Sequence, residues 1–402
     1  MDAVDHSQQQ AASYMLLFGA VAASALAMVA ALNYLVDPYL LHQWDSPLLQ
    51  RLRPTHEKLS VWGRTYAVAR YRPAVVYIGN SRTEMGLPAT ASEVFASTSV
   101  FNSAVSGASI GDAIKLARHA ARVSRVETMV WGIDAPSFSM EQGSAGIEPG
   151  LLEGGKAFFA QRALLNIKRG LTVDMTRDTL RLLHGSYGQV CRSSLALHGQ
   201  RDQRCVSDRI HGWGGTAKAM IPRLQEFGAG AGPTPQALAA FDATVAQLCR
   251  GGTRLRLYIN PTHAMTMDVL YWRGRWPDME RWQSDLAQLG ERYRQQGCDV
   301  RVHDFSGYNS ITSEAIPQFS GAREMQYYWE ASHYRDNVGR MILARLFGGE
   351  MVVPADFGVE LAPHSLPSHL QALRSARERR HASHPEESAF VRHVLSLPRQ
   401  AP

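Results

Sequence analysis

The hydrophobic pattern begins with one long apolar segment near the amino end of the chain. Residues 7–36 carry no Asp, Glu, Lys or Arg, and Tyr14–Leu32 is apolar almost throughout. A helix needs about 20 such residues to cross the hydrocarbon core of a bilayer. We therefore expect a transmembrane anchor over 14–36. A cleaved signal peptide is the alternative, with Ala25–Ala27 as a cleavage site, but no Lys or Arg precedes the apolar run.

Beyond this segment, short apolar runs alternate with amphipathic stretches. The runs have the length of buried strands and are Ala74–Gly79, Ser99–Ala104, Thr128–Ile133, Arg254–Ile259 and Asp299–His303. Helices are expected over Lys58–Arg70, Ile110–Val123, Met279–Gln296 and Arg335–Phe347. Continuously apolar strands that alternate with helices are typical of a parallel sheet covered on both faces. The sequence therefore predicts an α/β fold, with sites at the carboxyl ends of its strands.

Interruptions of this alternation predict the domains. We expect a short amino-terminal segment (1–13), the anchor (14–36), a juncture with a lead-in helix (37–72), the α/β domain (73–350) and a carboxyl-terminal tail (351–402) with a surface helix at 366–381. Residues 135–252 do not alternate, because they are Gly-rich, then helical, then loop-like. They indicate a mostly helical insertion that covers the site.

Charge and cysteine content narrow the class of protein. The net charge of +6 is scattered, and no run of five or six like charges suggests a nucleic-acid partner. Such a surface suits an anionic polysaccharide or lipid headgroups. The basic residues that follow the anchor would place the domain in the cytoplasm by the positive-inside rule, but they begin about 15 residues past the span, at the edge of its range.

The four cysteines form no CxxC pair, so no metal site is expected. Cys191 and Cys205 lie in a polar, loop-like stretch, where they would either close a local disulfide in an oxidising compartment or remain free thiols. Cys249 and Cys298 adjoin strand-like runs and are expected in the core.

The candidate chemistry centres on a serine directly after the first strand. Ser81 follows Gly79-Asn80 at a strand end, where a tight turn would expose it. A serine needs a base to remove its proton, and the base needs an orienting group. Glu330 and His333 are three residues apart, so they share a side of a turn or helix. We expect His333 to be the base and Glu330 to orient it, with the backbone N–H groups of Ser81 and Gly107 as the oxyanion hole.

These motifs resemble the SGNH (GDSL-like) hydrolase superfamily, and more closely its membrane-anchored bacterial members found with exopolysaccharide and cell-envelope acylation systems. The matching pieces, in the family's order, are Asp37-Pro38, Gly79–Thr83, Phe101–Ser109, Trp131–Asp134 and Ser332–Tyr334. The resemblance implies a flavodoxin-like three-layer α/β/α fold, acyl-ester chemistry without a cofactor, and a globular part in the periplasm of a single-pass inner-membrane protein.

Some residues depart from the family pattern or compete for a role. The third block of the family usually supplies an oxyanion asparagine, where this chain has Asp134. Arg82 follows the serine and would either bind an anionic group or pair with Asp134. His263 follows the fourth strand, where it would line the substrate site or form a turn. Asp304, after the fifth strand, rivals Glu330 as the orienting acid.

The resulting hypothesis is a serine-dependent O-acyltransferase or esterase. It would act on acyl esters, most plausibly acetyl esters, of a cell-envelope or exported polysaccharide. A membrane-embedded partner would deliver the acyl group, which favours transfer over hydrolysis. The alternative is a non-catalytic subunit of the same fold that binds a glycan or helps to assemble an envelope polysaccharide system, and Asp134 is its best support.

Overall fold

A computed structural model describes residues 2–42, 59, 61–95, 99–141, 147, 158–186, 195, 197–230, 232–320 and 324–398. Packing divides the chain into two compact units, Met1–Tyr66 with Gly155–Arg192, and Ala67–Gly154 with Ser193–Pro402. We call the first the anchor unit and the second the sheet unit.

The sheet unit is built on six strands in the order β2-β1-β3-β4-β5-β6. Their bounds are β1 Val75–Ile78, β2 Val100–Asn102, β3 Thr128–Ile133, β4 Arg254–Ile259, β5 Val300–Asp304 and β6 Val359–Glu360. The first five are parallel, and β6 pairs antiparallel with β5. The order 2-1-3-4-5 is that of flavodoxin-like sheets. The predicted α/β fold with a mostly parallel sheet is confirmed, and the two-residue β6 was not predicted.

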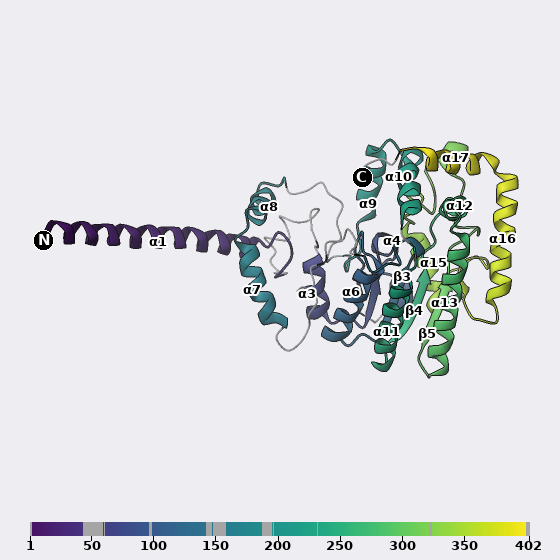
Figure 1. The fold of residues 1–402 in the computed structure, drawn as a ribbon, viewed down its shortest axis with the longest axis horizontal. Coiled ribbons are helices and arrows are strands. Elements are labelled where there is room, and N and C mark those ends of the chain that lie inside the picture. Colours follow the sequence, from purple (N-terminus) through teal and green to yellow (C-terminus); the bar gives the residue numbers. More distant parts are fainter. Residues whose placement is uncertain are drawn as a thin grey trace. The chain divides into compact units, whose positions relative to one another are not determined.

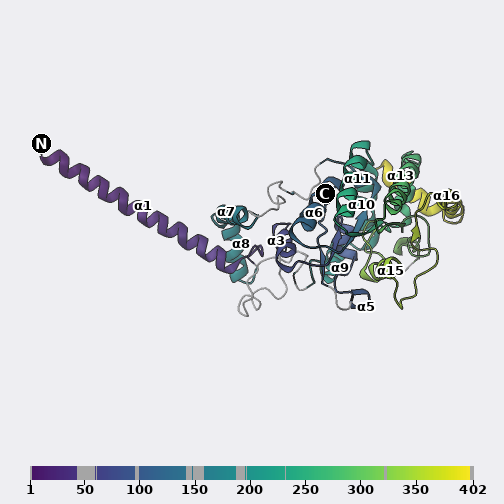
Figure 2. The same ribbon diagram turned by 90° about the horizontal axis from the view of Figure 1, so that it is seen from below.

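Helices cover both faces of the sheet, so its central strands β1 and β3 are buried along their whole length. One side carries α6 (Ile110–Val123), α11 (Pro235–Arg250) and α13 (Trp276–Gln295), and the other carries α5 (Ser92–Phe95) and α15 (Asp336–Phe347) (Figure 2). On the first side, Phe241 meets Trp131 and Phe138 edge to face, with ring centroids 4.9 and 5.3 Å apart. α6 has its predicted bounds, because a capping box of Ser109 and Asp112 begins it.

Shorter helices complete the sheet unit. They are α4 (Ser81–Gly86), the 3-10 turn η1 (Ala135–Ser137), α9 (Gln203–Gly212), α10 (Thr216–Ala229), α12 (Ala264–Trp272) and α14 (Pro317–Ser320). At the carboxyl end lie α16 (Leu366–Ser383), which is the helix expected at 366–381, and α17 (Pro385–Ser396). His369 and His381 of α16 bond to Asp304 and Asp268, at 2.9 and 2.8 Å, so α16 is tied to the sheet unit by buried carboxylates.

The segment expected as one insertion, 135–252, is divided in the structure. Its last helix, α11, is the crossover helix that joins β3 to β4 and packs on α6. α9 and α10 also belong to the sheet unit, and α9 covers residues that the sequence analysis took for a loop. Residues 155–192 belong to the anchor unit instead. The physical reason is that α7 (Phe158–Gly170) and α8 (Val173–Leu183) pack on α1 (Asp2–Val36), where Asn33 donates to the Gly170 carbonyl at 2.7 Å.

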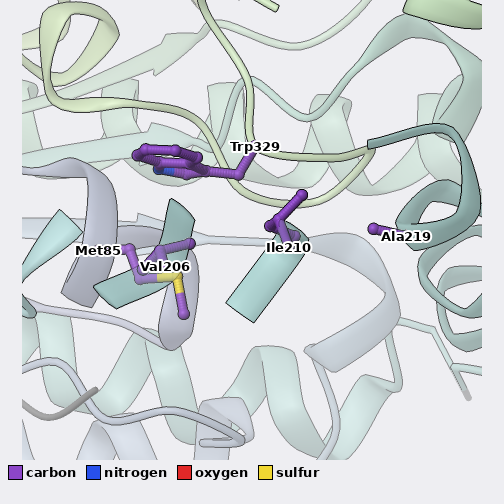
Figure 3. Close-up of a cluster of buried hydrophobic side chains, with 5 residues drawn as sticks. All are labelled: Met85, Val206, Ile210, Ala219 and Trp329. Carbon is purple, nitrogen blue, oxygen red and sulfur yellow. The ribbon is translucent and has the colours of Figure 1, made fainter. Parts of the chain in front are cut away.

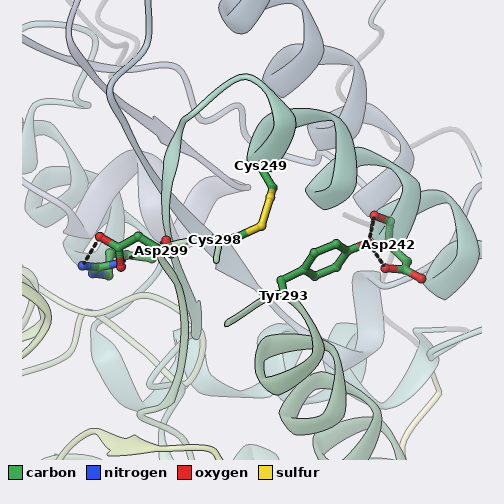
Figure 4. Close-up of a disulfide and its surroundings, with 6 residues drawn as sticks. Asp242, Cys249, Tyr293, Cys298 and Asp299 are labelled. Atoms are coloured by element: carbon green, nitrogen blue, oxygen red, sulfur yellow. Dashed lines mark hydrogen bonds and ion pairs between the residues drawn. A yellow bond between two sulfur atoms is a disulfide. The ribbon is translucent and has the colours of Figure 1, made fainter. Parts of the chain in front are cut away.

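A disulfide joins Cys249 at the end of α11 to Cys298 before β5, with Cα atoms 5.6 Å apart (Figure 4). The two cysteines were expected in the core, but both are half-buried and form this disulfide instead. Nearby, the Tyr293 hydroxyl donates to the carboxylate of Asp242 at 2.5 Å, so two contacts join α11 to the α13–β5 segment (Figure 4). Cys191 and Cys205, for which a local disulfide and free thiols were both left open, lie outside the side chains that the structure describes.

The anchor unit contains α1 (Asp2–Val36), α7 (Phe158–Gly170) and α8 (Val173–Leu183) (Figure 1). α3 (Val61–Tyr71) spans the boundary between the two units. Within α1, Gln10–Val36 contains an 18-residue stretch with a mean hydropathy of 2.3 and is long enough to cross a membrane. The predicted long apolar helix near the amino end is therefore confirmed.

Candidate active site

Ser81 lies at the carboxyl edge of the sheet, in the turn that follows β1. Gly79 has φ of +155°, and a β-carbon there would collide with the side chain of Thr83, so the turn requires glycine. Asn80 caps α4, because its Oδ1 accepts a hydrogen bond from the Arg82 N–H at 3.1 Å. The turn therefore places Ser81 as the first residue of a helix, where the strand order reverses between β1 and β3.

The base and acid come from a tight loop that precedes α15. Tyr328 and Tyr334 form a β-bridge, and the Trp329 N–H donates to the carbonyl of His333 at 2.9 Å. These backbone bonds close the loop and hold Glu330 and His333 on one side of it. The predicted spacing of the two residues therefore has a structural cause.

Ser81, His333 and Glu330 form one continuous chain of hydrogen bonds. His333 Nε2 lies 2.7 Å from Ser81 Oγ, and His333 Nδ1 bonds to Glu330 Oε1. The other carboxylate oxygen of Glu330 accepts the Ser332 N–H at 2.7 Å. Ser81 is half-buried, whereas Glu330 and His333 are buried. The structure thus brings together the three residues that the sequence analysis paired.

The charges around this chain favour a neutral histidine and an ionised acid. Burial lowers the pKa of His333, and the positive charges of Arg223 and Arg82 lower it further, which outweighs the opposite effect of Glu330. Burial alone would raise the pKa of Glu330, but His333, Arg223 and the Ser332 N–H together hold it below its usual value. At neutral pH the imidazole is therefore free to accept a proton from Ser81.

Asp134 serves as an acceptor that holds the site together. Its Oδ2 accepts the side-chain amides of Asn80 at 2.8 Å and Asn260 at 3.0 Å, and lies 3.2 Å from the Arg82 guanidinium. Asp134 was expected at the place of the oxyanion donor. With its carboxylate bonded to three donors, it fixes the Ser81 turn rather than donating to substrate. Of the two roles considered for Arg82, pairing with Asp134 is the one observed.

A buried network that the sequence analysis missed connects the serine helix to the histidine loop. The Tyr258 hydroxyl on β4 lies 2.9 Å from Thr83 Oγ1 on α4 and 3.2 Å from the hydroxyl of Tyr334. Tyr334, which follows the candidate base, also donates to Asn260 Oδ1 at 3.1 Å. These bonds fix the separation between the two halves of the site. Tyrosines within buried strands and loops give no sequence signal for this role, because they also fit core packing.

The turn that contains Gly107 is fastened to the serine helix. The Val105 N–H donates to the Gly79 carbonyl at 3.1 Å, which extends the pairing of β2 and β1 up to the serine turn. The Glu84 carboxylate of α4 accepts the Ser106 N–H at 2.9 Å and also binds the Ser106 hydroxyl. Gly107 follows with φ of +75°, at the same edge of the sheet. The predicted partner of Ser81 in the oxyanion hole thus lies on a turn that α4 positions.

His263 does not line the site. Its ring is fully buried, Nε2 bonds to the Glu314 carbonyl at 2.7 Å, and Nδ1 accepts the Met265 N–H at 3.3 Å, so it caps α12. Burial lowers the pKa of His263 to about 4, which keeps the ring neutral. Its backbone N–H donates to the Ala331 carbonyl at 2.9 Å and so supports the loop of the candidate base. Of the roles considered, the turn residue is the one observed.

α9 and α10 pack against both halves of the site. Met85 of α4, Val206 and Ile210 of α9, Ala219 of α10, and Trp329 beside the candidate acid form one buried cluster (Figure 3). From α10, Arg223 Nε reaches Glu330 Oε1 at 3.7 Å. Arg223 was missed because it lies in the segment read as an insertion, with no motif around it. These two helices lie within the segment expected as an insertion, and they contact both the serine helix and the histidine loop.

Comparisons with known proteins add a likeness at low similarity. No protein-family model matches the chain, and no curated protein matches it significantly. The structure is similar to one described as "a putative platelet activating factor from Streptococcus pneumonia", with a TM-score of 0.32, 13% sequence identity, and coverage of 70% of this chain and 88% of that chain. At this TM-score the likeness carries no information on activity.

The described residues can perform proton transfer between a serine and a histidine at the sheet edge. Among them, no group of three or more His, Cys, Asp or Glu side chains could hold a metal ion. The arrangement has the order serine, histidine, acid, with the acid on the far nitrogen of the ring. That order is the one that activates a serine for attack on a carbonyl carbon.

Proposed function

We propose that this protein is an SGNH-like serine enzyme that transfers or hydrolyses acyl groups. The single observation that supports it best is the Ser81–His333–Glu330 chain, with Ser81 Oγ and His333 Nε2 2.7 Å apart. The lowered pKa of His333 supports it further, because a general base must be unprotonated at working pH.

In the proposed mechanism, Ser81 Oγ attacks the carbonyl carbon of an acyl ester while His333 Nε2 takes its proton. Glu330 holds the ring in place and stabilises the imidazolium. The backbone N–H groups of Ser81 and Gly107 donate hydrogen bonds to the carbonyl oxygen and so stabilise the negative charge that develops on it. His333 then protonates the departing alcohol. In the second half, His333 deprotonates an acceptor hydroxyl or water, which attacks the acyl carbon, and His333 returns the proton to Ser81 Oγ as the acyl–serine bond breaks.

The setting that we propose is the periplasmic face of a bacterial inner membrane, with α1 as a single-pass anchor. The Cys249–Cys298 disulfide supports an oxidising compartment for the sheet unit, because thiols stay reduced in the cytosol. This outweighs the positive charges after the anchor, which begin about 15 residues past the span, at the limit of the positive-inside rule.

For the substrate we propose an acetyl ester donor and a hydroxyl of an envelope or exported polysaccharide. The resemblance of the sequence motifs to membrane-anchored SGNH-like proteins supports this choice. Anchoring supports transfer over hydrolysis, because a membrane-embedded partner can then deliver the acyl group to Ser81.

An ester assay on the full chain in detergent tests the proposal. The wild type is expected to cleave a chromogenic acetyl ester, and Ser81→Ala and His333→Ala are each expected to lose at least roughly 10³-fold in kcat/KM. Ser306→Ala is the matched control, because Ser306 is a buried serine bonded to another acid, Asp304. Equal rates for the wild type, Ser81→Ala and His333→Ala would contradict the proposal.

A further inference from the structure

The two helices α7 and α8 present an apolar surface that the anchor unit leaves uncovered. Six large apolar side chains on this hairpin are 43% to 73% exposed: Leu164, Ile167, Leu171, Val173, Leu180 and Leu183. Residues 164 and 167 of α7 and residue 171 directly after it follow helical spacing, so they form one stripe. On α8, residues 173, 180 and 183 do the same. A stripe of this size facing water is unusual for a soluble protein.

The opposite, buried face of α7 is polar. Arg162 is 1% exposed; its guanidinium donates to Thr65 Oγ1 at 2.7 Å and lies 4.8 Å from the ring centre of Trp62. Asn166 is also buried and donates to the hydroxyl of Tyr66 at 3.0 Å. α7 therefore buries the polar Arg162 and Asn166 while it exposes the apolar Leu164 and Ile167. A helix in water does the reverse, whereas a helix against lipid places polar groups toward the protein.

The apolar stripe adjoins the end of the membrane-spanning segment. Asn33, in the last turn of α1, donates to the Gly170 carbonyl at 2.7 Å and lies 2.9 Å from Thr176 Oγ1. The Tyr39 hydroxyl, just beyond α1, donates to Asp178 at 2.8 Å. These bonds attach the hairpin to the point where Gln10–Val36 ends, which is the membrane surface if α1 spans the bilayer.

A largely apolar cavity lies beside the stripe. A cavity of about 530 Å³ lies among α1, α3, α7 and α8, and its lining includes Ala30, Ala31, Ala163 and Ile167. Tyr34, His42, Tyr66 and Asn166 also line it, so the cavity combines an apolar wall with a few polar groups, as a site for a lipid chain near its headgroup does.

The charges on the hairpin fit a bilayer surface. α7 and α8 together carry five basic and two acidic side chains. Among them Lys168, Arg177 and Arg181 are exposed. Basic side chains that flank an apolar stripe are typical of helices that lie in the headgroup region of anionic membranes.

We propose that α7 and α8 form an interfacial hairpin that lies in the lipid bilayer beside α1. Leu164, Ile167, Leu171, Val173, Leu180 and Leu183 insert at the boundary between headgroups and acyl chains. The chain then contacts the membrane through two elements rather than through α1 alone. The proposal is independent of the chemistry at Ser81.

Photo-crosslinking of the full chain tests this placement. A diazirine analogue of leucine replaces Leu164 or Leu180 in the hairpin, and the protein is reconstituted in vesicles of phosphatidylethanolamine and phosphatidylglycerol. Leu26, which is 56% exposed on α1, is the positive control. Leu182, which is 1% exposed and only two residues from Leu180, is the matched control. After illumination, mass spectrometry identifies what each position has captured.

Phospholipid adducts at positions 164 and 180, as at position 26, with protein-internal products at 182, are the expected result. Water adducts at 164 and 180 beside lipid adducts at 26 would overturn the proposal, because the stripe would then face solvent. Crosslinks from 164 and 180 to a second copy of the chain would overturn it too, since the stripe would be a protein interface. A lack of lipid adducts at position 26 would show that α1 does not contact lipid. It would then also contradict the placement of the hairpin at the membrane.

Discussion

The sheet unit contains two groups of serine, histidine and acid, and they differ in which residue stands in the middle. In the first, His333 is central: Ser81 Oγ bonds to one ring nitrogen, at 2.7 Å, and Glu330 to the other. In the second, the acid is central. Asp304 accepts the Ser306 hydroxyl at 2.6 Å and bonds to His369 Nε2 at 2.9 Å.

This difference in connectivity decides what each group can do. The Ser306 hydroxyl donates a hydrogen bond to the Asp304 carboxylate. This carboxylate also accepts the Ser306 N–H at 2.8 Å and the Gln283 side-chain amide at 2.7 Å. Among the residues that the structure describes, no imidazole bonds to Ser306, so the second group has no general base for its serine. Its described contacts hold α16 against the end of β5. Residue types alone therefore do not define a reactive serine, whereas the order of the bonds does.

The electrostatics of the two histidines differ in the same sense. Burial and two arginines lower the pKa of His333, so its ring is a free base at neutral pH. Burial would also lower the pKa of His369, but the bond to Asp304 and the charge of Asp304 raise it above its ordinary value. His369 therefore favours the protonated form, which strengthens an ion pair and cannot accept a proton from serine.

The largest expected effect comes from exchanging each acid for its amide. Glu330→Gln is expected to lower kcat by roughly 10² to 10⁴-fold, because the amide no longer stabilises the imidazolium and can hold the wrong tautomer. Asp304→Asn changes the acid of the second group and is expected to leave kcat within about threefold of the wild type in folded protein. Ester hydrolysis by both variants measures this contrast. A comparable loss in the two would show that the groups are not functionally distinct.

A smaller effect is expected at Arg223, whose charge helps to keep His333 neutral. Activity should fall as the pH drops through the lowered pKa of His333, below about 6.5, because protonated imidazole cannot act as the base. Removing the charge with Arg223→Gln raises the pKa of His333, so this acid limb moves to higher pH. A pH profile of kcat/KM detects the move.

Arg223→Lys serves as the control for this profile, because it keeps the positive charge and should keep the acid limb near that of the wild type. An unchanged acid limb in Arg223→Gln would contradict the electrostatic role of Arg223.

The smallest effect concerns stability. His369 has a folded pKa above its ordinary value, so its contribution is fully present below about pH 6.5 and is lost as the pH rises through the folded pKa. His369→Gln is expected to lower the free energy of unfolding by roughly 1–3 kcal/mol in acid, through the lost bond to a buried carboxylate, and by less at alkaline pH. Urea titrations at several pH values measure this.

His393→Gln, at an exposed position of α17, is the control and should have little effect at any pH. A stability loss in His369→Gln that grows as the pH rises would contradict the predicted pH dependence of the His369 contribution.

The sheet could be predicted from the sequence because its strands are buried on both faces. The predicted runs Thr128–Ile133 and Arg254–Ile259 have the bounds of β3 and β4. The core of the candidate site could also be predicted, since Ser81 follows a strand and Glu330 precedes His333 by three residues. Both signals are local in the chain.

The remaining features depend on contacts between distant residues. Asp134 stands where the family pattern has an oxyanion asparagine, but Arg82, Asn80 and Asn260 converge on it only in the fold. Arg223 meets an acid 107 positions later, and no local pattern marks that pair. Helical periodicity on α7 shows that its two faces differ. Only the packing shows that the polar face is the buried one.

Covalent labelling tests the central claim, that His333 activates Ser81, most directly. The full chain is treated with a fluorophosphonate, which reacts with activated serines, and the labelled peptide is identified by mass spectrometry. We expect an adduct on Ser81, its loss in His333→Ala, and no adduct on Ser306. An unlabelled Ser81 in folded protein, or equal labelling of Ser81 with and without His333, would contradict it.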